Sequence, residues 1–269
     1  MSVKMVRRLY KYAPFTTNLL SSLATGQLWY PKATSFNDPF DCAVIDFQRR
    51  FELGIERSNK KIIKRPQAPK TASESERQFT AILQSIHNDF LTHRSERDKL
   101  VSSMLSEFGS SLQRSLADFG ILCLTEDPKN ILMWSHYAAN HTGVCLEFYR
   151  ANGSKLKSDA RPVRYVSSRY QGKGSDLVFD KFVGWQYERE WRLLEKEGNM
   201  MYRFPGPLRS IICGARMSKE HLAILRHLVE SPLFNSGVRV AVKYAFMHHD
   251  KYSISIDANH VSEGDPVSS

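Results

Sequence analysis

The chain has 269 residues, with 42% hydrophobic and 25% charged side chains, a composition typical of a globular protein and not of a disordered one. Its formal net charge of +10 favours anionic partners such as nucleotides, nucleic acid or acidic surfaces. No run reaches the roughly 18 apolar residues of a membrane helix, and no N-terminal signal peptide is visible, so we expect no membrane contact and a cytoplasmic setting.

The N-terminal part predicts a strand, a helix and a second strand. Large side chains alternate in "RRLYKYAPF" (7–15), which is typical of a short strand. Thr16 or Thr17 can cap the helix that follows, and Gly26 can end it. "QLWYP" (27–31) then predicts a strand before the turn-rich stretch "ATSFNDPFDC" (33–42).

The middle third is expected to be an insertion, residues 49–118. Its first part, 49–70, carries eight basic and two acidic residues, which fits either a solvated loop or a phosphate-binding patch. Apolar residues then recur at helical spacing, and the pattern predicts a helix from Ser73 to Ala117.

From Gly120 onward, strand-type runs dominate: "GILCLTE", "GVCLEFY", "PVRYV", "EREWRLL", "RSIICGA", "VRVAVKYAFM" and "YSISID". Ser218 caps one further helix, "SKEHLAILRHLVES". We therefore expect one α+β domain over 1–260, with a mixed, mostly antiparallel, split sheet and flanking helices, followed by a flexible tail at 261–269.

The stretch "VGWQYEREWRLLEKE" (183–197) holds two closely spaced acids. If "EREWRLL" is a strand, Glu188, Glu190 and Arg192 share one face, with the two carboxylates roughly 7 Å apart. Trp191 and Leu193 then face the core, and Arg189 lies along the core as well. A carboxylate pair aimed at a substrate and a solvent-exposed face with a weak ion pair both fit this pattern.

The loop "SFNDPFDC" (35–42) predicts an Asx-type turn at Asn37 and Asp38 before Pro39. Phe36 and Phe40 should anchor this loop against the core. Asp41 would then be an acid on a pinned loop.

The segment "CLTEDPKNILMWSHYAANHTGVCLEF" (123–148) predicts a strand, a helix and a strand. Asp127 should cap the helix with Pro128 at its first position, the helix should reach about Ala139, and Gly143 should allow the turn into the next strand. His136 fits a catalytic role or a structural one. Its spacing to His141 is not that of a helical zinc pair, and no metal site is predicted there or at "HHD" (248–250).

These motifs together resemble a bacterial domain-of-unknown-function family, number 2971. The resemblance rests on "LYKY", "LWYP", "TSFNDPFDC", "GILCLTEDPKNILMWSHYAANHTGVCLEF", "WQYEREWRLL" and "GARMSKEH". It spans most of the chain except the basic middle segment and the tail.

A second resemblance concerns mechanism. The order of an aromatic-bearing strand, a helix, a strand and a late Glu-x-Glu is similar to that of ADP-ribosyltransferases. It implies NAD as a substrate held in a cleft of the split sheet, with Glu190 as the catalytic glutamate and Glu188 orienting the acceptor. It also implies Tyr10 or Tyr12 at the nicotinamide pocket and Tyr137 as a stacking residue. Taken together with the motifs above, the candidate catalytic residues are Glu190, Glu188, Arg192 and His136, and the candidate cofactor-binding residues are Tyr10, Lys11, Tyr12, Asn37, Asp38, Trp134 and Tyr137.

Three functions remain open on the sequence. The first is an ADP-ribosyltransferase-like enzyme, a toxin or phage-defence effector that modifies nucleic acid or protein. The second is a sensor module that binds a nucleotide or peptide. The third is a metal-dependent, nuclease-like hydrolase built on Asp38, Asp41, Glu188 and Glu190, with Lys181 nearby. No GxGxxG after a strand, no GxxxxGK[ST] and no GxSxG occurs, which argues against Rossmann dehydrogenases, P-loop NTPases and α/β-hydrolases.

Overall fold

A computed structural model describes residues 6–38, 40–41, 118–168, 178–231, 234 and 240–258, together with five single residues between 74 and 84. The chain divides into two compact units, one made of 1–43 with 118–269 and the other of 44–117. In the second unit the described residues are all helical: Glu74, Arg77, Thr80, Ala81 and Gln84. The predicted basic segment 49–70, most of the predicted helix 73–117 and the predicted tail 261–269 lie outside the described residues.

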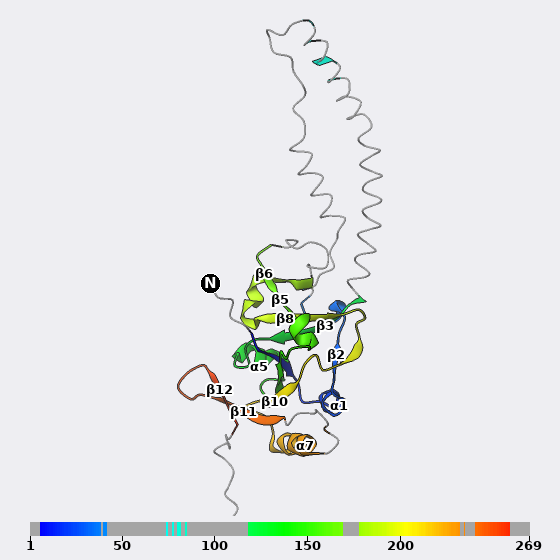
Figure 1. The fold of residues 1–269 in the computed structure, drawn as a ribbon. Coiled ribbons are helices and arrows are strands. Elements are labelled where there is room, and N and C mark those ends of the chain that lie inside the picture. The colour runs from blue at the N-terminus through cyan, green and yellow to red at the C-terminus, as the bar shows by residue number, and fades with distance from the viewer. Residues whose placement is uncertain are drawn as a thin grey trace, which may run out of the picture. The chain divides into compact units, whose positions relative to one another are not determined.

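The first unit is built on an eight-stranded open sheet in the order β12-β11-β10-β4-β1-β3-β8-β5 (Figure 1). Its strands are β1 (Arg8–Ala13), β3 (Gly120–Thr125), β4 (Val144–Tyr149), β5 (Arg161–Pro162), β8 (Glu190–Glu195), β10 (Leu208–Cys213), β11 (Ala241–Met247) and β12 (Ile254–Asp257). All neighbours are antiparallel except β10 and β11, which are parallel. The predicted α+β class with a mixed, mostly antiparallel sheet is confirmed.

Two small sheets complete the strand set. They pair β2 (Gln27–Tyr30) with β9 (Met200–Arg203) and β6 (Arg164–Val166) with β7 (Asp180–Phe182). The predicted strand "PVRYV" is therefore wrong as one element, because its residues are divided between β5 on the main sheet and β6 in a small one.

The helices are α1 (Thr17–Thr25), α5 (Ile131–Tyr137), α6 (Lys155–Ser158) and α7 (Lys219–Glu230), with 3₁₀ turns η1 (Ala33–Ser35) and η3 (Val183–Glu188). As predicted, the side chain of Thr16 caps α1 and Gly26 ends it at φ 65°, in the left-handed region that glycine adopts without strain. Ser218 caps α7, as predicted. None of the helices formed by described residues is both long enough and apolar enough to cross a membrane.

The start of α5 differs from the prediction. Asn130, and not Asp127, caps the helix, because its side-chain oxygen accepts from the backbone N–H groups of Leu132 and Met133. The carboxylate of Asp127 instead accepts from the backbone N–H of Lys129, which makes a separate turn before the helix. The helix therefore begins three residues later than a cap at Asp127 with Pro128 at the first helical position requires.

The end of α5 also differs, because the helix stops at Tyr137 and three left-handed residues follow. Ala139, Asn140 and His141 have φ values of 46°, 54° and 70°. These three residues, and not Gly143, supply the left-handed turn. Glycine is required at position 143 for lack of space, because a Cβ there would lie 2.3 Å from the carbonyl oxygen of Ala13 on β1. The backbone of this segment therefore packs directly against β1.

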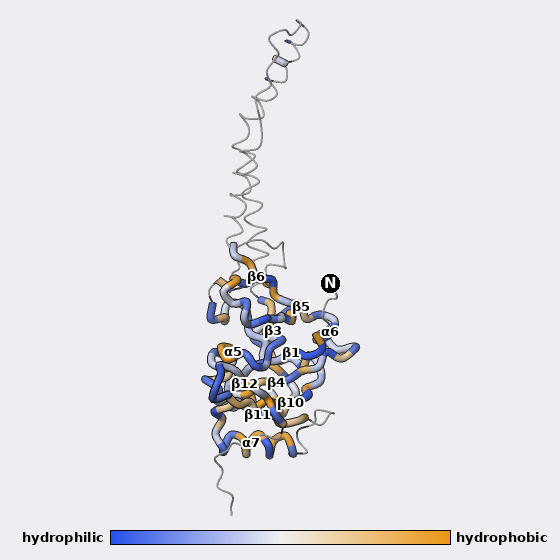
Figure 2. The backbone as a smooth tube through the Cα atoms, turned by 90° about the vertical axis from the view of Figure 1, so that its left-hand side faces the viewer, coloured by the Kyte–Doolittle hydropathy of each residue, from blue (hydrophilic) through white to orange (hydrophobic). Residues whose placement is uncertain are grey.

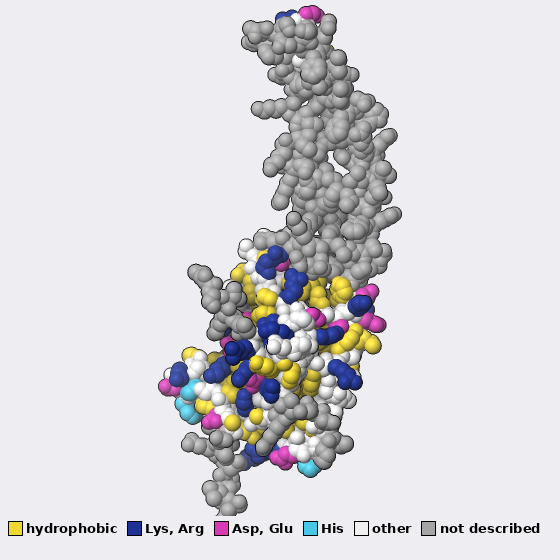
Figure 3. Space-filling model, in the orientation of Figure 1, with side chains coloured by type: hydrophobic (Ala, Val, Ile, Leu, Met, Phe, Trp, Pro, Cys, Tyr) yellow, Lys and Arg dark blue, Asp and Glu magenta, His cyan; other side chains and the backbone are white. Residues whose placement is uncertain are grey.

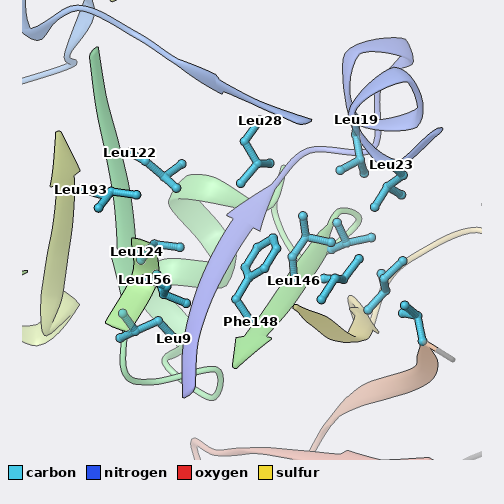
Figure 4. Close-up of a cluster of buried hydrophobic side chains, with 14 of the residues drawn as sticks. Leu9, Leu19, Leu23, Leu28, Leu122, Leu124, Leu146, Phe148, Leu156 and Leu193 are labelled. Carbon is cyan, nitrogen blue, oxygen red and sulfur yellow. The ribbon is translucent and has the colours of Figure 1, made fainter. Parts of the chain in front are cut away.

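Each face of the main sheet buries its own hydrophobic cluster. The larger cluster joins the sheet to α1, β2, α6 and α7, and Figure 4 shows leucines from several of these elements pointing toward one another. The smaller cluster joins Tyr12, Cys145 and Ile212 of the sheet to Met133 and Trp134 of α5. The helix α5 therefore lies on the opposite face from α1 and α7.

The neighbouring strands β1 and β3 pair at a single position. Tyr10 opposes Thr125, whereas β1 pairs with β4 along all six of its residues. Away from the Tyr10–Thr125 pair, β1 and β3 form no further ladder. The sheet is thus open at its centre, and this opening positions the candidate site.

Candidate functional site

A pocket of about 400 Å³ lies where β1 and β3 separate, within the range of about 300–1,000 Å³ common for ligand sites. Side chains from β1, β3, α5, β7, η3 and β8 meet there with the loop that follows β2. Its described lining is Tyr10, Lys11, Tyr12, Pro31, Ser35, Phe36, Asn37, Asp41, Ile121, Cys123, Leu124, Thr125, Met133, His136, Tyr137, Lys181, Glu188 and Glu190.

The strand β8 presents Glu190 and Arg192 on the pocket side. Their cross-strand partners on β3 are Thr125 and Cys123, two further residues of that side. Leu193, on the opposite face of β8, is fully buried in the larger core, and Trp191 packs against that core. The predicted alternation of faces is therefore confirmed from residue 190 onward.

Arg192 is completely buried behind Glu190. Its Nε donates to Glu190 Oε1 at 2.7 Å, and one terminal nitrogen donates to both oxygens of Asp41 at 2.7 and 2.8 Å. The other terminal nitrogen donates to the carbonyl oxygen of Val178 at 2.6 Å. Arg192 does not line the pocket, so the structure places it as a group that fixes two carboxylates, not as one that meets a ligand.

Lys181 lies at the centre of three carboxylates. Its Nζ is 2.5 Å from Glu188 Oε2, 2.8 Å from Glu190 Oε2 and 3.2 Å from Asp41 Oδ2. All four side chains are buried. With Arg192, the cluster combines three acids with two permanent cations, which leaves one negative charge when every acid is ionised. Such a cluster is stable only because each carboxylate is paired and hydrogen-bonded.

Glu188 reaches this cluster from a turn and not from the strand. It is the last residue of η3, and Arg189 follows with φ 45° in the left-handed region before β8 begins. The prediction that Glu188, Glu190 and Arg192 share one face of a single strand is therefore wrong at Glu188. Arg189 is exposed, so its predicted position along the core is also wrong.

Three hydrogen bonds hold the turn that carries Glu188. Thr125 Oγ1 donates to the Glu188 carbonyl at 2.5 Å, and Asn130 Nδ2 donates to the Tyr187 carbonyl at 2.9 Å. Tyr137 Oη donates to Glu188 Oε1 at 2.7 Å. The backbone of the turn is thereby held from β3 and from the cap of α5, and the Glu188 carboxylate is held from α5 itself.

The pKa values of the two glutamates are displaced in opposite directions. Burial raises the pKa of Glu190, but the charges of Arg192 and Lys181 outweigh it and hold the pKa at about 2. Burial raises the pKa of Glu188, and Lys181 offsets this only in part. A neighbouring pair with separated pKa values is a common arrangement of acid–base sites. Glu190 is therefore held as an anion, and burial makes Glu188 the more easily protonated of the two.

Tyrosines surround the carboxylates. Burial raises the pKa of Tyr137 and raises that of Tyr165 to about 12, so both hydroxyls remain neutral. The Tyr165 hydroxyl oxygen accepts from the Glu190 backbone N–H at 2.8 Å, which fixes the start of β8. On β1, Tyr12 is buried and donates to the Asp127 carbonyl oxygen at 2.9 Å.

The loop after β2 supplies Asp41 to the cluster. The predicted Asx turn is present, because Asp38 Oδ1 accepts from the Phe40 backbone N–H at 2.8 Å. Phe36 lines the pocket, with its ring centroid 5.6 Å from the Arg192 guanidinium carbon. Phe40 is 65% exposed, so its predicted anchoring role is wrong.

The other predicted ligand contacts divide into two groups. Tyr10, Lys11, Tyr12, Asn37, Tyr137 and His136 all line the pocket. Two residues do not: Trp134 is fully buried in the smaller core with its indole N–H on the Pro128 carbonyl, and Asp38 accepts from the indole N–H of Trp185 at 2.7 Å. Trp134 and Asp38 are therefore structural in this fold. His136 is exposed and makes no side-chain hydrogen bond with any residue that the structure describes.

Comparisons with known proteins support part of the sequence interpretation. Residues 133–173 match the model of a family described as "Protein of unknown function (DUF2971)". This segment resembles DUF2971. It begins in α5 and includes three pocket residues, Met133, His136 and Tyr137. No curated protein and no solved structure matches the chain, so the resemblance to ADP-ribosyltransferases finds no support among known proteins.

Three residues in and around this site carry no strong sequence signal. Lys181 follows no periodic pattern, although it is the centre of the cluster. Cys123 lines the pocket, whereas Tyr165 lies outside the lining and contacts the Glu190 backbone. Both belong to strand runs, and their contacts in the site are with residues distant in the sequence, so no local signal identifies them.

Proposed function

We propose that the central pocket binds the nicotinamide–ribose part of NAD and transfers the ADP-ribosyl group to a nucleic acid or protein acceptor. The observation that carries this proposal is the buried pair Glu188 and Glu190 beside the tyrosines of β1. Cleavage of a glycosidic bond develops positive charge on the sugar, and a fixed carboxylate stabilises that charge.

Glu190 supplies the fixed negative charge. Because Arg192 and Lys181 keep it ionised, its charge does not depend on pH in the neutral range. Its side chain is also immobile, since both oxygens accept hydrogen bonds from buried donors. A preorganised anion needs no rearrangement when the oxocarbenium-like charge develops.

Glu188 supplies the base. As the bond between the ribose C1′ and nicotinamide breaks, nicotinamide leaves with the bonding electron pair. An acceptor hydroxyl or amine then bonds to C1′, and its proton passes to the ionised Glu188. The raised pKa of Glu188 improves it as a base, and Tyr137 holds the receiving oxygen in place.

The remaining lining suits the other parts of such a ligand. Tyr10 and Tyr137 provide flat surfaces for a pyridine ring, and Asn37 provides an amide near them. Lys11 is half-buried at the same pocket and provides a positive charge for a phosphate.

The charge arrangement favours this reading over a metal-dependent hydrolase. A divalent cation would need the carboxylates of Asp41, Glu188 and Glu190, but the Lys181 ammonium already lies between them. Among the described residues, no three His, Cys, Asp or Glu side chains form a group suited to hold a metal ion. A sensor module would bind its ligand in the same pocket without turnover. An assay for product formation therefore distinguishes it from a transferase.

The test is release of nicotinamide from labelled NAD by the full chain, with RNA, DNA and lysate protein as acceptors. Glu188→Gln should reduce turnover by about 100-fold or more, as expected for loss of a general base. Glu195→Gln, the same change on β8 outside the pocket lining, should leave turnover within twofold.

Full activity in folded Glu188→Gln and Glu190→Gln proteins would overturn the mechanism. If NAD raises the melting temperature of the wild-type chain and no product forms with any acceptor, the pocket is a binding site and not a transferase centre.

A further inference from the structure

A second groove, of about 680 Å³, lies beside α7 on the C-terminal half of β11. The strand β10, the helix α7 and the strand β11 form a βαβ unit, and β10 and β11 are its two parallel strands. The groove is lined by the loop that follows β10 and by residues 244–249, so it lies at the carboxyl ends of both strands. In α/β units this is the edge at which ligands commonly bind.

The groove is basic. Among the described residues that line it are Lys219, Arg226, His248 and His249, and none of them is an acid. The nearest acids along the chain, Glu220 and Asp250, do not belong to the lining. On the face drawn in Figure 3, Lys and Arg side chains are spread widely over the described residues, so positive charge alone does not mark this groove. The groove is notable because basic and aromatic side chains line it together.

Arg226 is held in place by an aromatic partner. Its Nε and one terminal nitrogen donate to the Tyr244 hydroxyl at 2.9 and 2.6 Å, and the guanidinium carbon lies 5.5 Å from the ring centroid. A guanidinium has five N–H donors, and Tyr244 engages two of them. The arginine is thus oriented before any ligand arrives and retains donors for a phosphate.

Flat side chains continue along β11. The rings of Phe246 and His248 lie 5.5 Å apart, and His248 Nε2 is 2.6 Å from Ser255 Oγ on β12, which fixes the imidazole. Phe246 is half-buried, and Met247 beside it is 50% exposed. The helix α7 also contributes to the lining, and Figure 2 shows hydrophobic and hydrophilic residues alternating along it. Aromatic rings beside fixed cations are the elements that bind nucleobases and phosphates together.

The wall formed by the loop after β10 is rigid. Gly214 donates its backbone N–H to the Gly143 carbonyl at 2.9 Å, and Arg216 donates its backbone N–H to the His141 carbonyl at 3.0 Å. A Cβ at Gly214 would lie 2.1 Å from the His141 carbonyl oxygen, so only glycine fits there. The sequence motifs "GARMSKEH" and "HHD", which have no part in the central pocket, both contribute to this groove.

We propose that this groove is a nucleotide-binding site, in which Arg226 and Lys219 hold the phosphate and the rings along β11 hold the base. The site is distinct from the central pocket, with which it shares no lining residue. The ligand chemistry is a nucleotide unit, available either as a free mononucleotide or within a single strand of nucleic acid.

The experiment titrates the full chain with fluorescent AMP and with a labelled single-stranded oligonucleotide at several salt concentrations. Arg226→Gln is expected to weaken binding of the tighter ligand at least tenfold and, for the oligonucleotide, to reduce the salt dependence by about one phosphate contact. Arg216→Gln removes the same charge from the neighbouring loop, outside the groove lining, and should change binding by less than threefold.

Comparing AMP with the oligonucleotide shows whether the natural ligand is a free nucleotide or a nucleic-acid strand. Saturable AMP binding that Arg226→Gln abolishes assigns a free nucleotide, and oligonucleotide binding alone with the same mutational effect assigns a strand. Equal losses in Arg216→Gln and Arg226→Gln, or no binding of either ligand at millimolar concentration, would overturn the proposal. The transferase mechanism is tested by nicotinamide release and this site by ligand binding that depends on Arg226, so the failure of one and the failure of the other give different results.

Discussion

Glu188 and Glu190 share one ammonium group, since Lys181 Nζ lies 2.5 Å from an oxygen of the first and 2.8 Å from an oxygen of the second. Their surroundings nevertheless differ. Glu190 also pairs with buried Arg192, whereas Glu188 accepts its other hydrogen bond from the neutral Tyr137. Two acids two residues apart therefore have pKa values displaced in opposite directions, and this difference makes their roles separable by mutation.

The same substitution should have different effects on stability at the two positions. Burial disfavours the charged form of Glu188, so Glu188→Gln should leave the free energy of unfolding at pH 7 within about 1 kcal/mol of wild type. Glu190→Gln breaks a buried pair and should cost about 3–5 kcal/mol. Urea denaturation measures both values, and equal losses would contradict this assignment.

The pKa of Glu190 also predicts a pH dependence. It is about 2 in the folded chain against an ordinary value of 4.5, so the folded state holds the ionised form more strongly than the unfolded state does. This contribution is complete above about pH 4.5 and is lost as the pH falls through 2, and it amounts to on the order of 3 kcal/mol. The difference in free energy of unfolding between wild type and Glu190→Gln should therefore shrink between pH 5 and pH 3. A difference that stays constant over this range would show that Glu190 is not held ionised.

The parts of this fold that could be predicted are those set by local chemistry. Thr16 and Gly26 define α1 because a cap bond and a left-handed residue act within one turn of the helix. The start of α5 was misplaced because Asp127 and Pro128 carry a helix-start signal, but Asn130 makes the cap. Local periodicity also could not show that Arg189 leaves the strand conformation. Lys181 could not be placed at all, because its partners are set by tertiary packing of β7 against η3 and β8.

Lys181 should be essential for the stability of the cluster. Lys181→Met leaves three buried carboxylates, of which Arg192 pairs with Asp41 and Glu190, and we expect a loss of about 3–5 kcal/mol at pH 7. Removing the ammonium raises the folded-state pKa of its carboxylate partners, so the loss should become smaller when unfolding is measured at pH 5. Lys155→Met provides the control. Lys155 is 56% exposed and pairs with Glu195 at the surface, so its loss should cost no more than about 1 kcal/mol.

Asn130 is expected to act through both ends of its amide. The oxygen caps α5 and the nitrogen holds the carbonyl of Tyr187 in the turn that carries Glu188. Asn130→Ala removes both functions and should cost about 2 kcal/mol. Asn130→Asp keeps the cap and removes only the donor, so it should cost less in stability while lowering NAD turnover as Asn130→Ala does. If Asn130→Asp retains full turnover, the bond to Tyr187 does not position Glu188.

Two glycines test the close contact between β1 and the segment after α5. A Cβ on Gly143 would lie 2.3 Å from the Ala13 carbonyl oxygen and 3.0 Å from that of Ala138, and neither backbone can move without disturbing the β1–β4 ladder. We therefore expect Gly143→Ala to cost several kcal/mol, at the upper end for single substitutions, or to prevent folding. Gly153→Ala is the matched control, since Gly153 has φ 77° but nothing within 4 Å of an added Cβ. Its cost should be only the left-handed backbone strain of about 1–2 kcal/mol. Circular dichroism melts of the two variants measure this difference, and a Gly143→Ala protein that melts no lower than Gly153→Ala would mean that β1 lies farther from this segment.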